Sequence, residues 1–322
     1  MNLKVWLCAG SLIFPLATNA AQGRPYPDRP IRLIVPSAPG GGMDTLARFI
    51  GQRLTEQWHQ QVVVDTRPGA TGIIGTEITA KATPDGYTLL LAWVSPLSIN
   101  PGLYRKLPYD VDRDLAPIMM VATTPNILVV RPSLNVASVK DFIALAKAKP
   151  GQLTYASSGI GGLSHLAGEL LRTMAGINIV HVPYKGTPPA LIDVTAGRVD
   201  ALFAVAAPAL PHIKAGKLKA IAVSNAHRWP EMPALPTVGE TLPGFAAENW
   251  YGFMAPAGTP QRIIDKLNAE VARYLKDPAV TQKLAQVGFL VAATSPQDCA
   301  RYIHSEQIKW REVIKTAGVR AE

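Results

Sequence analysis

Short apolar runs alternate along this chain with stretches in which apolar residues recur every three or four positions. The run 31–35 is typical of a buried strand. One helical face follows it, formed by Met43, Leu46, Ala47, Ile50 and Leu54. Because strand-like and helix-like segments keep alternating in this way, the pattern predicts an α/β fold with largely parallel sheets.

The same alternation continues to the end of the chain. Further strands are expected at 62–64, 87–93, 126–130, 153–157, 178–183, 201–205, 219–224, 249–254 and 289–292. Helices are expected at 139–147, 163–174, 189–196, 211–214, 260–276, 278–286 and 296–315. With 322 residues, the chain is long enough for two domains of about 150 residues each.

The first twenty residues differ from this pattern. Lys4 precedes a largely apolar stretch, 5–16, that is too short to span a bilayer, and Ala20 offers a small residue for cleavage. Residues 1–20 are therefore predicted to be a signal peptide cleaved near Ala20. The alternative, a buried N-terminal helix, is disfavoured by Pro15. No later segment has about 18 uninterrupted apolar residues, so the exported protein is expected to be soluble.

Charge and cysteine content narrow the possible partners. The formal net charge is +9, but Lys and Arg are scattered rather than clustered, so nucleic-acid binding is not expected. A modest positive field would still help to collect anions. Once a signal peptide containing Cys8 is removed, Cys299 is alone, which excludes an internal disulfide and a cysteine metal cluster.

Two glycine-rich turns are the most informative motifs. One is 39–45 and the other is 157–165, and each joins a predicted strand to a predicted helix. Glycines at such a turn leave the helix N-terminus uncovered, so its free N–H groups and dipole form a site for an anion. One turn lies in each half of the chain, which suits a ligand held between two lobes at the strand ends. A third loop, 68–72, is placed to border the same cleft.

A purely structural interpretation of these residues stays open. Asp44 or Thr45 can serve as a helix cap in a tight turn. Trp93, Tyr184 and Trp250 stand near predicted strand ends, where aromatic residues line pockets about as often as they pack a core or hinge.

Motifs for catalysis or cofactor binding are missing from the sequence. The glycines at 159, 161 and 162 lack the dinucleotide-binding spacing, because Ser164 stands where a third glycine is needed. There is no phosphate-binding Gly-Lys-Ser/Thr loop and no Gly-x-Ser-x-Gly nucleophile turn. Ser164 and His165 are adjacent and point in different directions on a helix, so they do not form a nucleophile–base pair. We therefore expect no enzyme activity, no cofactor and no metal.

The sequence resembles the substrate-binding receptors of tripartite tricarboxylate transporters, the TctC or Bug-type periplasmic receptors. The resemblance covers nearly the whole chain after the signal peptide. The matching segments are, in order, 26–31 (YPDRPI), 39–44 (PGGGMD), 67–70 (RPGA), 84–90 (PDGYTLL), 99–101 (INP), 107–110 (LPYD), 164–169 (SHLAGE), 182–186 (VPYKG), 210–213 (LPHI), 235–238 (LPTV) and 255–260 (APAGTP).

The resemblance implies a two-lobed "Venus flytrap" fold, similar to type II periplasmic binding proteins, with crossed connections. Lobe 1 would span 21–124 and 246–322, and lobe 2 would span 125–245. The implied function is to capture a small carboxylate metabolite in the periplasm and deliver it to the membrane permease subunits, as a monomer. Backbone groups of the two glycine-rich loops would hold the carboxylate. The candidate ligand-binding residues are Gly41, Gly42, Met43, Asp44, Thr71, Trp93, Ser157, Ser158, Gly161, Gly162, His165, Tyr184, Ala204 and Trp250.

Three positions depart from the family pattern. Ser37 stands where an aromatic residue is usual, Trp93 replaces a small residue, and Ala204 stands where an aspartate is common. Without that acid the pocket lacks a partner for a ligand ammonium, so we hypothesise a monoanionic ligand, aromatic or aliphatic, rather than an acidic amino acid. Two alternative functions remain: a receptor for a two-component sensor kinase, and an enzyme on the same scaffold.

Overall fold

The computed structural model describes residues 25–320 of the chain. The expected signal peptide, 1–20, lies outside the described residues. Within 25–320, no helix combines the length and the apolar character that a membrane crossing requires.

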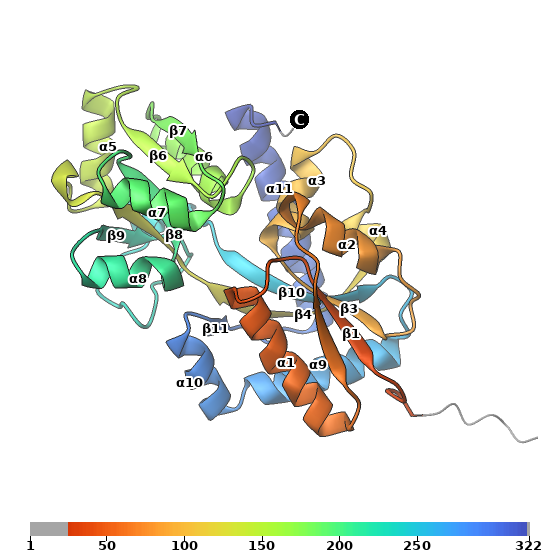
Figure 1. The fold of residues 1–322 in the computed structure, drawn as a ribbon. Coiled ribbons are helices and arrows are strands. Elements are labelled where there is room, and N and C mark those ends of the chain that lie inside the picture. The colour runs from red at the N-terminus through yellow and green to blue at the C-terminus, as the bar shows by residue number, and fades with distance from the viewer. Residues whose placement is uncertain (1–24, 321–322) are drawn as a thin grey trace, which may run out of the picture.

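The first sheet has six strands in the order β11-β4-β10-β3-β1-β2. We refer to this sheet with its helices as lobe 1 (Figure 1). The elements of its N-terminal part are β1 (Ile31–Val35), α1 (Gly42–Trp58), β2 (Val62–Thr66), η1 (Ala70–Gly72), α2 (Ile73–Ala80), β3 (Thr88–Trp93), η2 (Ser95–Ile99), α3 (Asn100–Leu103), α4 (Val111–Asp114) and β4 (Leu115–Thr124). Its C-terminal part adds β10 (Asn249–Pro256), α9 (Gln261–Leu275), α10 (Pro278–Gln286), β11 (Leu290–Val291) and α11 (Pro296–Ala317).

The second sheet has five strands in the order β7-β6-β8-β5-β9. With its helices it forms lobe 2. The elements of lobe 2 are β5 (Asn126–Val130), η3 (Pro132–Leu134), α5 (Val139–Ala148), β6 (Thr154–Ser157), α6 (Leu163–Ala175), β7 (Val180–Pro183), α7 (Thr187–Thr195), β8 (Ala201–Val205), α8 (Ala206–Lys214), β9 (Lys219–Val223) and η4 (Val238–Glu240).

The chain crosses between the lobes twice, once from β4 to β5 and once between β9 and β10 (Figure 1). The two connections are bonded to each other. The N–H of Ser224, just after β9, donates to the carbonyl of Asn126 at the start of β5 at 2.8 Å. Within the second connection, the N–H of Ala247 donates to the carbonyl of Ser224 at 2.8 Å. This arrangement confirms the expected two-lobed α/β fold with crossed connections.

The expectation of largely parallel sheets needs correction. Parallel pairing joins β1 to β2 and β3, and β6 to β7 and β8. The remaining pairs, which involve β4, β5, β9, β10 and β11, are antiparallel. The reason lies in the crossings, because β4, β5, β9 and β10 flank them and carry the chain back and forth between the lobes.

Strand β4 was not expected from the sequence, although it lies in the interior of the six-stranded sheet. Its ten residues include Pro117, which normally argues against an interior strand because proline has no N–H to donate. Pro117 pairs with Met254 directly beside a register shift in the β4–β10 ladder. An irregularity of this kind is where a sheet tolerates proline.

Candidate functional site

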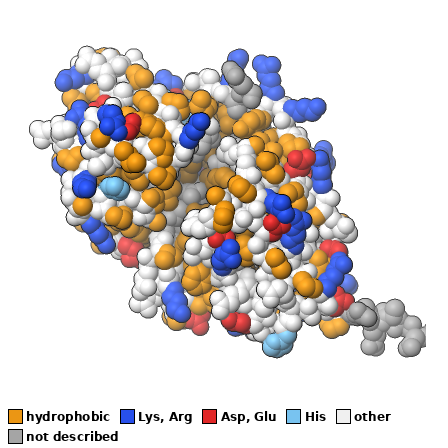
Figure 2. Space-filling view, in the orientation of Figure 1, with side chains coloured by type: hydrophobic (Ala, Val, Ile, Leu, Met, Phe, Trp, Pro, Cys, Tyr) orange, Lys and Arg blue, Asp and Glu red, His pale blue; other side chains and the backbone are white. Residues whose placement is uncertain are grey.

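A cavity of about 310 Å³ lies between the two lobes. Figure 2 shows a hollow between them. The lobe 1 residues that line the cavity are Thr71, Trp93, Ser95 and Asn249. Those from lobe 2 are Asn126, Ser158, Gly159, Ile160, Gly162, Leu163, Ser164, Thr187, Phe203 and Val205.

Four helices begin at this cavity. Helix α6 starts after Gly162, α7 after Gly186 and α8 after Val205, all in lobe 2, and α2 starts after Gly72 in lobe 1. No side chain caps the first N–H groups of any of these helices. Helix N-termini carry partial positive charge, so their convergence favours an anion from both sides. Free N–H donors are concentrated at α6, because α7 begins Thr187-Pro188-Pro189 and the Ala206 N–H of α8 already donates to the Pro125 carbonyl at 3.1 Å.

The side chains that line the cavity are all neutral. None of the fourteen lining residues is Lys, Arg, Asp, Glu or His. Its attraction for an anion therefore comes from backbone dipoles and hydroxyl groups rather than from an ion pair. Elsewhere in residues 25–320, no three His, Cys, Asp or Glu side chains gather in a way that would hold a metal ion.

Unused hydrogen-bonding capacity gathers at the cavity. Ser95 Oγ, Asn126 Oδ1 and Asn249 Oδ1 are buried and have no hydrogen-bond partner among the described residues. The amide nitrogen of Asn249 is already used, because it donates to the Tyr251 hydroxyl at 3.0 Å. Buried polar atoms normally have partners, so these three residues are suited to polar groups of a ligand.

The loop before α6 is held by its own serines and glycines. Ser164 Oγ accepts the N–H of Ser158 at 2.9 Å and lies 2.9 Å from the Ser158 hydroxyl. Gly159 and Gly161 have φ of 139° and 74°, which side chains rarely adopt. Ser164 is thus a structural partner of the loop, which agrees with its rejection as a nucleophile.

Trp93 closes the lobe 1 side of the cavity. It packs on Gly72, where a Cβ atom would lie 2.8 Å from Trp93 Cη2. Gly72 also has φ of 87°, so glycine is required there both by conformation and by the close ring. The indole ring faces the start of α2 and, with Phe203 from lobe 2, makes part of the lining apolar.

The structure places the fourteen expected residues in three groups. Thr71, Trp93, Ser158 and Gly162 line the cavity. The second group, Ser157, Gly161 and His165, belongs to the loop before α6 or packs against it without lining the cavity. The third group lies away from the cavity lining and comprises Gly41, Gly42, Met43, Asp44, Tyr184, Ala204 and Trp250.

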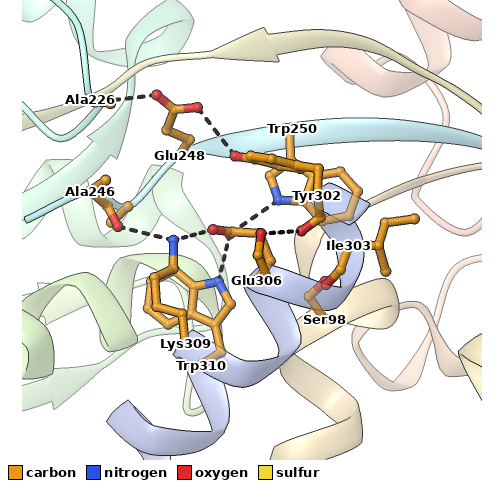
Figure 3. Close-up of polar contacts among 12 residues, drawn as sticks. Ser98, Ala226, Ala246, Glu248, Trp250, Tyr302, Ile303, Glu306, Lys309 and Trp310 are labelled. Atoms are coloured by element: carbon orange, nitrogen blue, oxygen red, sulfur yellow. Dashed lines mark hydrogen bonds and ion pairs between the residues drawn. The ribbon is translucent and has the colours of Figure 1, made fainter. Parts of the chain in front are cut away.

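Residues of the third group have structural partners. Tyr184 donates its hydroxyl to Asp193 at 2.6 Å, and Ala204 is fully buried in the core of lobe 2. Trp250 is buried too, and its indole N–H donates to Glu306 at 3.3 Å (Figure 3).

The glycine-rich turn before α1 is separate from the cavity. Gly41 and Gly42 are exposed, while Met43 and Asp44 are buried. Burial raises the pKa of Asp44, but hydrogen bonds from Arg48 and the Gly40 N–H outweigh it and hold the pKa below its usual value. In Figure 1 the N-terminal end of α1 lies on the side of lobe 1 that faces lobe 2. Within lobe 1, the start of α2 contributes to the cavity and the start of α1 does not.

Several lining residues were missed by the sequence analysis. Asn126 and Asn249 begin strands next to the two crossings, and Ser95 lies in the π-helical turn η2. Thr187, Phe203 and Val205 were missed as well, whereas Gly159, Ile160, Leu163 and Ser164 lie within the turn 157–165 but were not named as ligand-binding residues. The start of α7 carries a usable signal, because Gly186 precedes Thr187 and two prolines as in a helix N-terminus. Nothing in the sequence marks Ser95.

Comparison with known proteins gives consistent matches along the chain. A family described as "Tripartite tricarboxylate transporter family receptor" matches residues 46–319. Protein BugT of Bordetella pertussis is 39% identical over 320 residues, which cover 99% of this chain and 97% of BugT.

Solved structures with bound ligands are also similar. R. palustris Rpa4515 with adipate has a TM-score of 0.81 and 39% identity, covering 92% of this chain and 99% of that one. MatC from Rhodopseudomonas palustris with bound malate has a TM-score of 0.76 and 31% identity, covering 90% of this chain and 100% of that one.

Proposed function

This chain belongs to the family of tripartite tricarboxylate transporter receptors, and we propose that it binds a small dicarboxylate in the cavity between its lobes. The family consists of receptors, so the chain is a solute-binding receptor rather than an enzyme. Receptors of this family work in the periplasm. Cleavage of residues 1–20 near Ala20 is part of the proposal, as is a monomeric state, which light scattering on the purified protein checks.

The observation that carries the proposal is the convergence of four uncapped helix starts on a cavity with neutral side chains. Each charge-assisted hydrogen bond contributes about 1.5–3 kcal/mol. About four of them, less the cost of ordering the ligand and the lobes, are enough for a micromolar Kd, which corresponds to about −8 kcal/mol. Since the donors come from both lobes, the ligand favours the closed arrangement.

The partial positive charges of the helix starts, which lie on both sides of the cavity, support a dicarboxylate. Three helix starts from lobe 2 serve one carboxylate, and the start of α2 in lobe 1 serves a second one. We therefore favour a dianion over the monoanion hypothesised from the sequence. The related structures hold adipate and malate, which are dicarboxylates. An ammonium group would find no carboxylate among the lining residues, so acidic amino acids are disfavoured.

Isothermal titration with a small panel tests this proposal. Adipate, malate, benzoate and glutamate are titrated into protein that has been unfolded and refolded to remove carried-over ligand. We expect adipate or malate to bind at least tenfold more tightly than benzoate and glutamate. Tightest binding of glutamate would overturn the proposal, and tightest binding of benzoate would restore the monoanionic, aromatic alternative.

Delivery to the permease is the role that family membership supports, and signalling to a sensor kinase is the alternative. The two are distinguished by uptake of the labelled ligand in cells with and without the receptor gene. We expect uptake to require the receptor. Normal uptake with a lost transcriptional response would favour the sensor.

A further inference from the structure

Two histidines are stacked directly beneath the loop that carries Ser158, Gly159, Ile160 and Gly162 to the cavity. The rings of His165 and His181 lie 3.8 Å apart between centroids, with 14° between their planes. Tyr155 continues the stack, with its ring 5.0 Å from that of His181. His165 is 5% exposed, and His181 is half-buried on the edge strand β7.

Each histidine accepts or shares a hydrogen bond at one end of the loop. His165 Nδ1 accepts the N–H of Gly161 at 3.0 Å. His181 Nε2 lies 2.6 Å from Ser157 Oγ, and the same oxygen accepts the N–H of Gly159 at 3.1 Å. The loop is thus fixed at both ends by imidazole nitrogens, which in turn sets the position of the α6 start.

We propose that His165 and His181 are positioning residues that keep the loop 158–162 in its ligand-binding shape only while both rings are uncharged, so that acid loosens the loop and releases the ligand. The ligand part of this inference rests on the proposed function, whereas the loosening of the loop does not.

The chemistry of the bond to Gly161 requires a neutral ring. Nδ1 accepts a hydrogen bond only when its proton is absent, so the His165 proton resides on Nε2. A second proton, on Nδ1, would place two donors against each other at Gly161. Stacked rings at this distance also cannot both carry a positive charge without strong repulsion.

The charged residues near the two histidines do not compensate a positive charge on either ring. Glu169 is the acid nearest the pair, and its Oε1 lies 3.9 Å from His165 Nε2. That carboxylate already accepts the Tyr155 hydroxyl at 2.5 Å and the Arg172 Nε–H at 2.8 Å. Burial lowers the pKa of His165, with Glu169 opposing and Arg172 adding to the effect. Burial and then the charge of His165 lower the pKa of His181 to about 4, with Glu169 opposing.

The direction of the pH effect follows from these shifts. Both folded-state pKa values lie below the ordinary 6.5, so the rings are neutral near pH 7 and the loop is intact. As the pH falls from 6.5 towards about 4, the population of molecules with a protonated histidine and an open loop rises, and the population with the intact loop falls. The loop therefore opens on acidification, and the ligand affinity falls with it.

Hydrogen exchange of the full chain without ligand tests the proposal. We expect the protection factors of the Gly159 and Gly161 amides, corrected for the intrinsic pH dependence of exchange, to fall at least tenfold between pH 7 and pH 4. The fall should follow the titration of the two histidines, observed by NMR in the same samples. If the loop amides keep their protection while the histidines titrate, or lose it at another pH, the proposal is wrong.

Substitutions test whether the two histidine rings, rather than other titrating groups, cause the loss of protection in acid. The pair His165→Asn with His181→Gln replaces the accepting nitrogen of His165, and the nitrogen of His181 beside Ser157 Oγ, by amide groups that do not titrate, so protection at pH 7 should persist and change less than twofold down to pH 4. His165→Leu should lose protection of Gly161 at pH 7 already. His304→Asn, at an exposed histidine of α11, is the control and should behave as wild type. A tenfold fall in the doubly substituted protein would contradict the proposal.

Ligand binding is measured separately, because the dicarboxylate itself takes up protons in acid. The wild-type affinity for adipate should fall more steeply below pH 6 than that of the doubly substituted protein, since the protonation of adipate is common to both. A failure of adipate to bind at any pH would contradict the proposed function and leave the exchange result unaffected.

Discussion

Gly162 is the residue on which the proposed anion site depends most directly. It precedes α6, lines the cavity and has φ of −71°, so its lack of a side chain serves space rather than conformation. A Cβ atom there would lie 3.3 Å from both the Gly159 carbonyl oxygen and Ser158 Oγ. A larger group at this position would cover the N–H groups at the start of α6, beside the cavity.

We expect Gly162→Val to weaken carboxylate binding at least tenfold, which corresponds to about 1.4 kcal/mol. The matched control is Gly42→Val at the start of α1, where a Cβ atom would lie 3.3 Å from Phe289 and away from the cavity lining. Isothermal titration of both proteins checks this. Loss of binding in Gly42→Val alone would move the site to the turn at 39–45, as the sequence analysis expected.

Cys299 shows how burial settles the role of a single residue. Its side chain is fully buried on α11, and burial raises the pKa of its thiol to about 12. The thiol therefore stays protonated at neutral pH and is a poor nucleophile, so it acts as a small core residue.

At the level of elements, α11 ties the second crossing to lobe 1. Glu306 is buried and accepts the indole N–H of Trp310 at 2.9 Å and that of Trp250 at 3.3 Å. It also pairs with Lys309, which donates to the carbonyl of Ala246 at 3.2 Å (Figure 3). One carboxylate thus joins α11, β10 and the segment that leads from lobe 2.

Glu306→Leu should destabilise the protein by about 3–5 kcal/mol, because it leaves the ammonium of Lys309 without its partner in a largely buried place. Urea unfolding followed by fluorescence measures the change. Arg301→Ala is the control, since its ion pair with Asp298 on the same helix is exposed and should contribute no more than about 1 kcal/mol. Equal effects of the two substitutions would contradict the assignment of Glu306.

The sequence predicts elements well where one physical rule dominates. Helices α9 and α11 have a clear apolar face and are found within a few residues of their expected bounds. Helix α2 was missed because its sequence contains Gly75 and follows Gly69 and Gly72, which together suggest a loop. Gly75 instead allows close packing, since a Cβ atom there would lie 2.7 Å from Pro36 Cβ. Such a contact is not visible in a single sequence.

The candidate site was predictable in part for the same reason. The loop at 157–162 carries its own glycine pattern, and Ser158 and Gly162 indeed line the cavity. Asn126 and Asn249 are far apart in sequence and meet at the cavity only because both crossings run beside it. Their place depends on tertiary structure, which local patterns do not encode.

At the level of the whole molecule, the lobes touch near the cavity. Gly161 of lobe 2 faces Leu103 of lobe 1, so closely that a Cβ atom on Gly161 would overlap Leu103 Cδ2. Helix α11 of lobe 1 also packs against α6 of lobe 2 (Figure 1). The arrangement of the two lobes therefore depends on a small residue at 161.

Gly161→Ala should hold the lobes apart and weaken ligand binding at least tenfold. Gly216→Ala is the matched control, because Gly216 has φ of 67°, close to the 74° of Gly161, and open space around it. Both substitutions should cost about 1 kcal/mol of stability through backbone strain, but only Gly161→Ala should reduce affinity. Titration and urea unfolding of the two proteins distinguish the effects, and equal affinities would refute a closing contact at Gly161.

The neutral lining of the cavity has a consequence for the medium in which the receptor works. Dissolved salt screens exposed charges strongly but hardly reaches dipoles enclosed between two lobes. The affinity for the ligand should thus stay nearly constant as the ionic strength rises. Only the association rate, which the net positive charge of the protein increases for an anion, should fall with added salt.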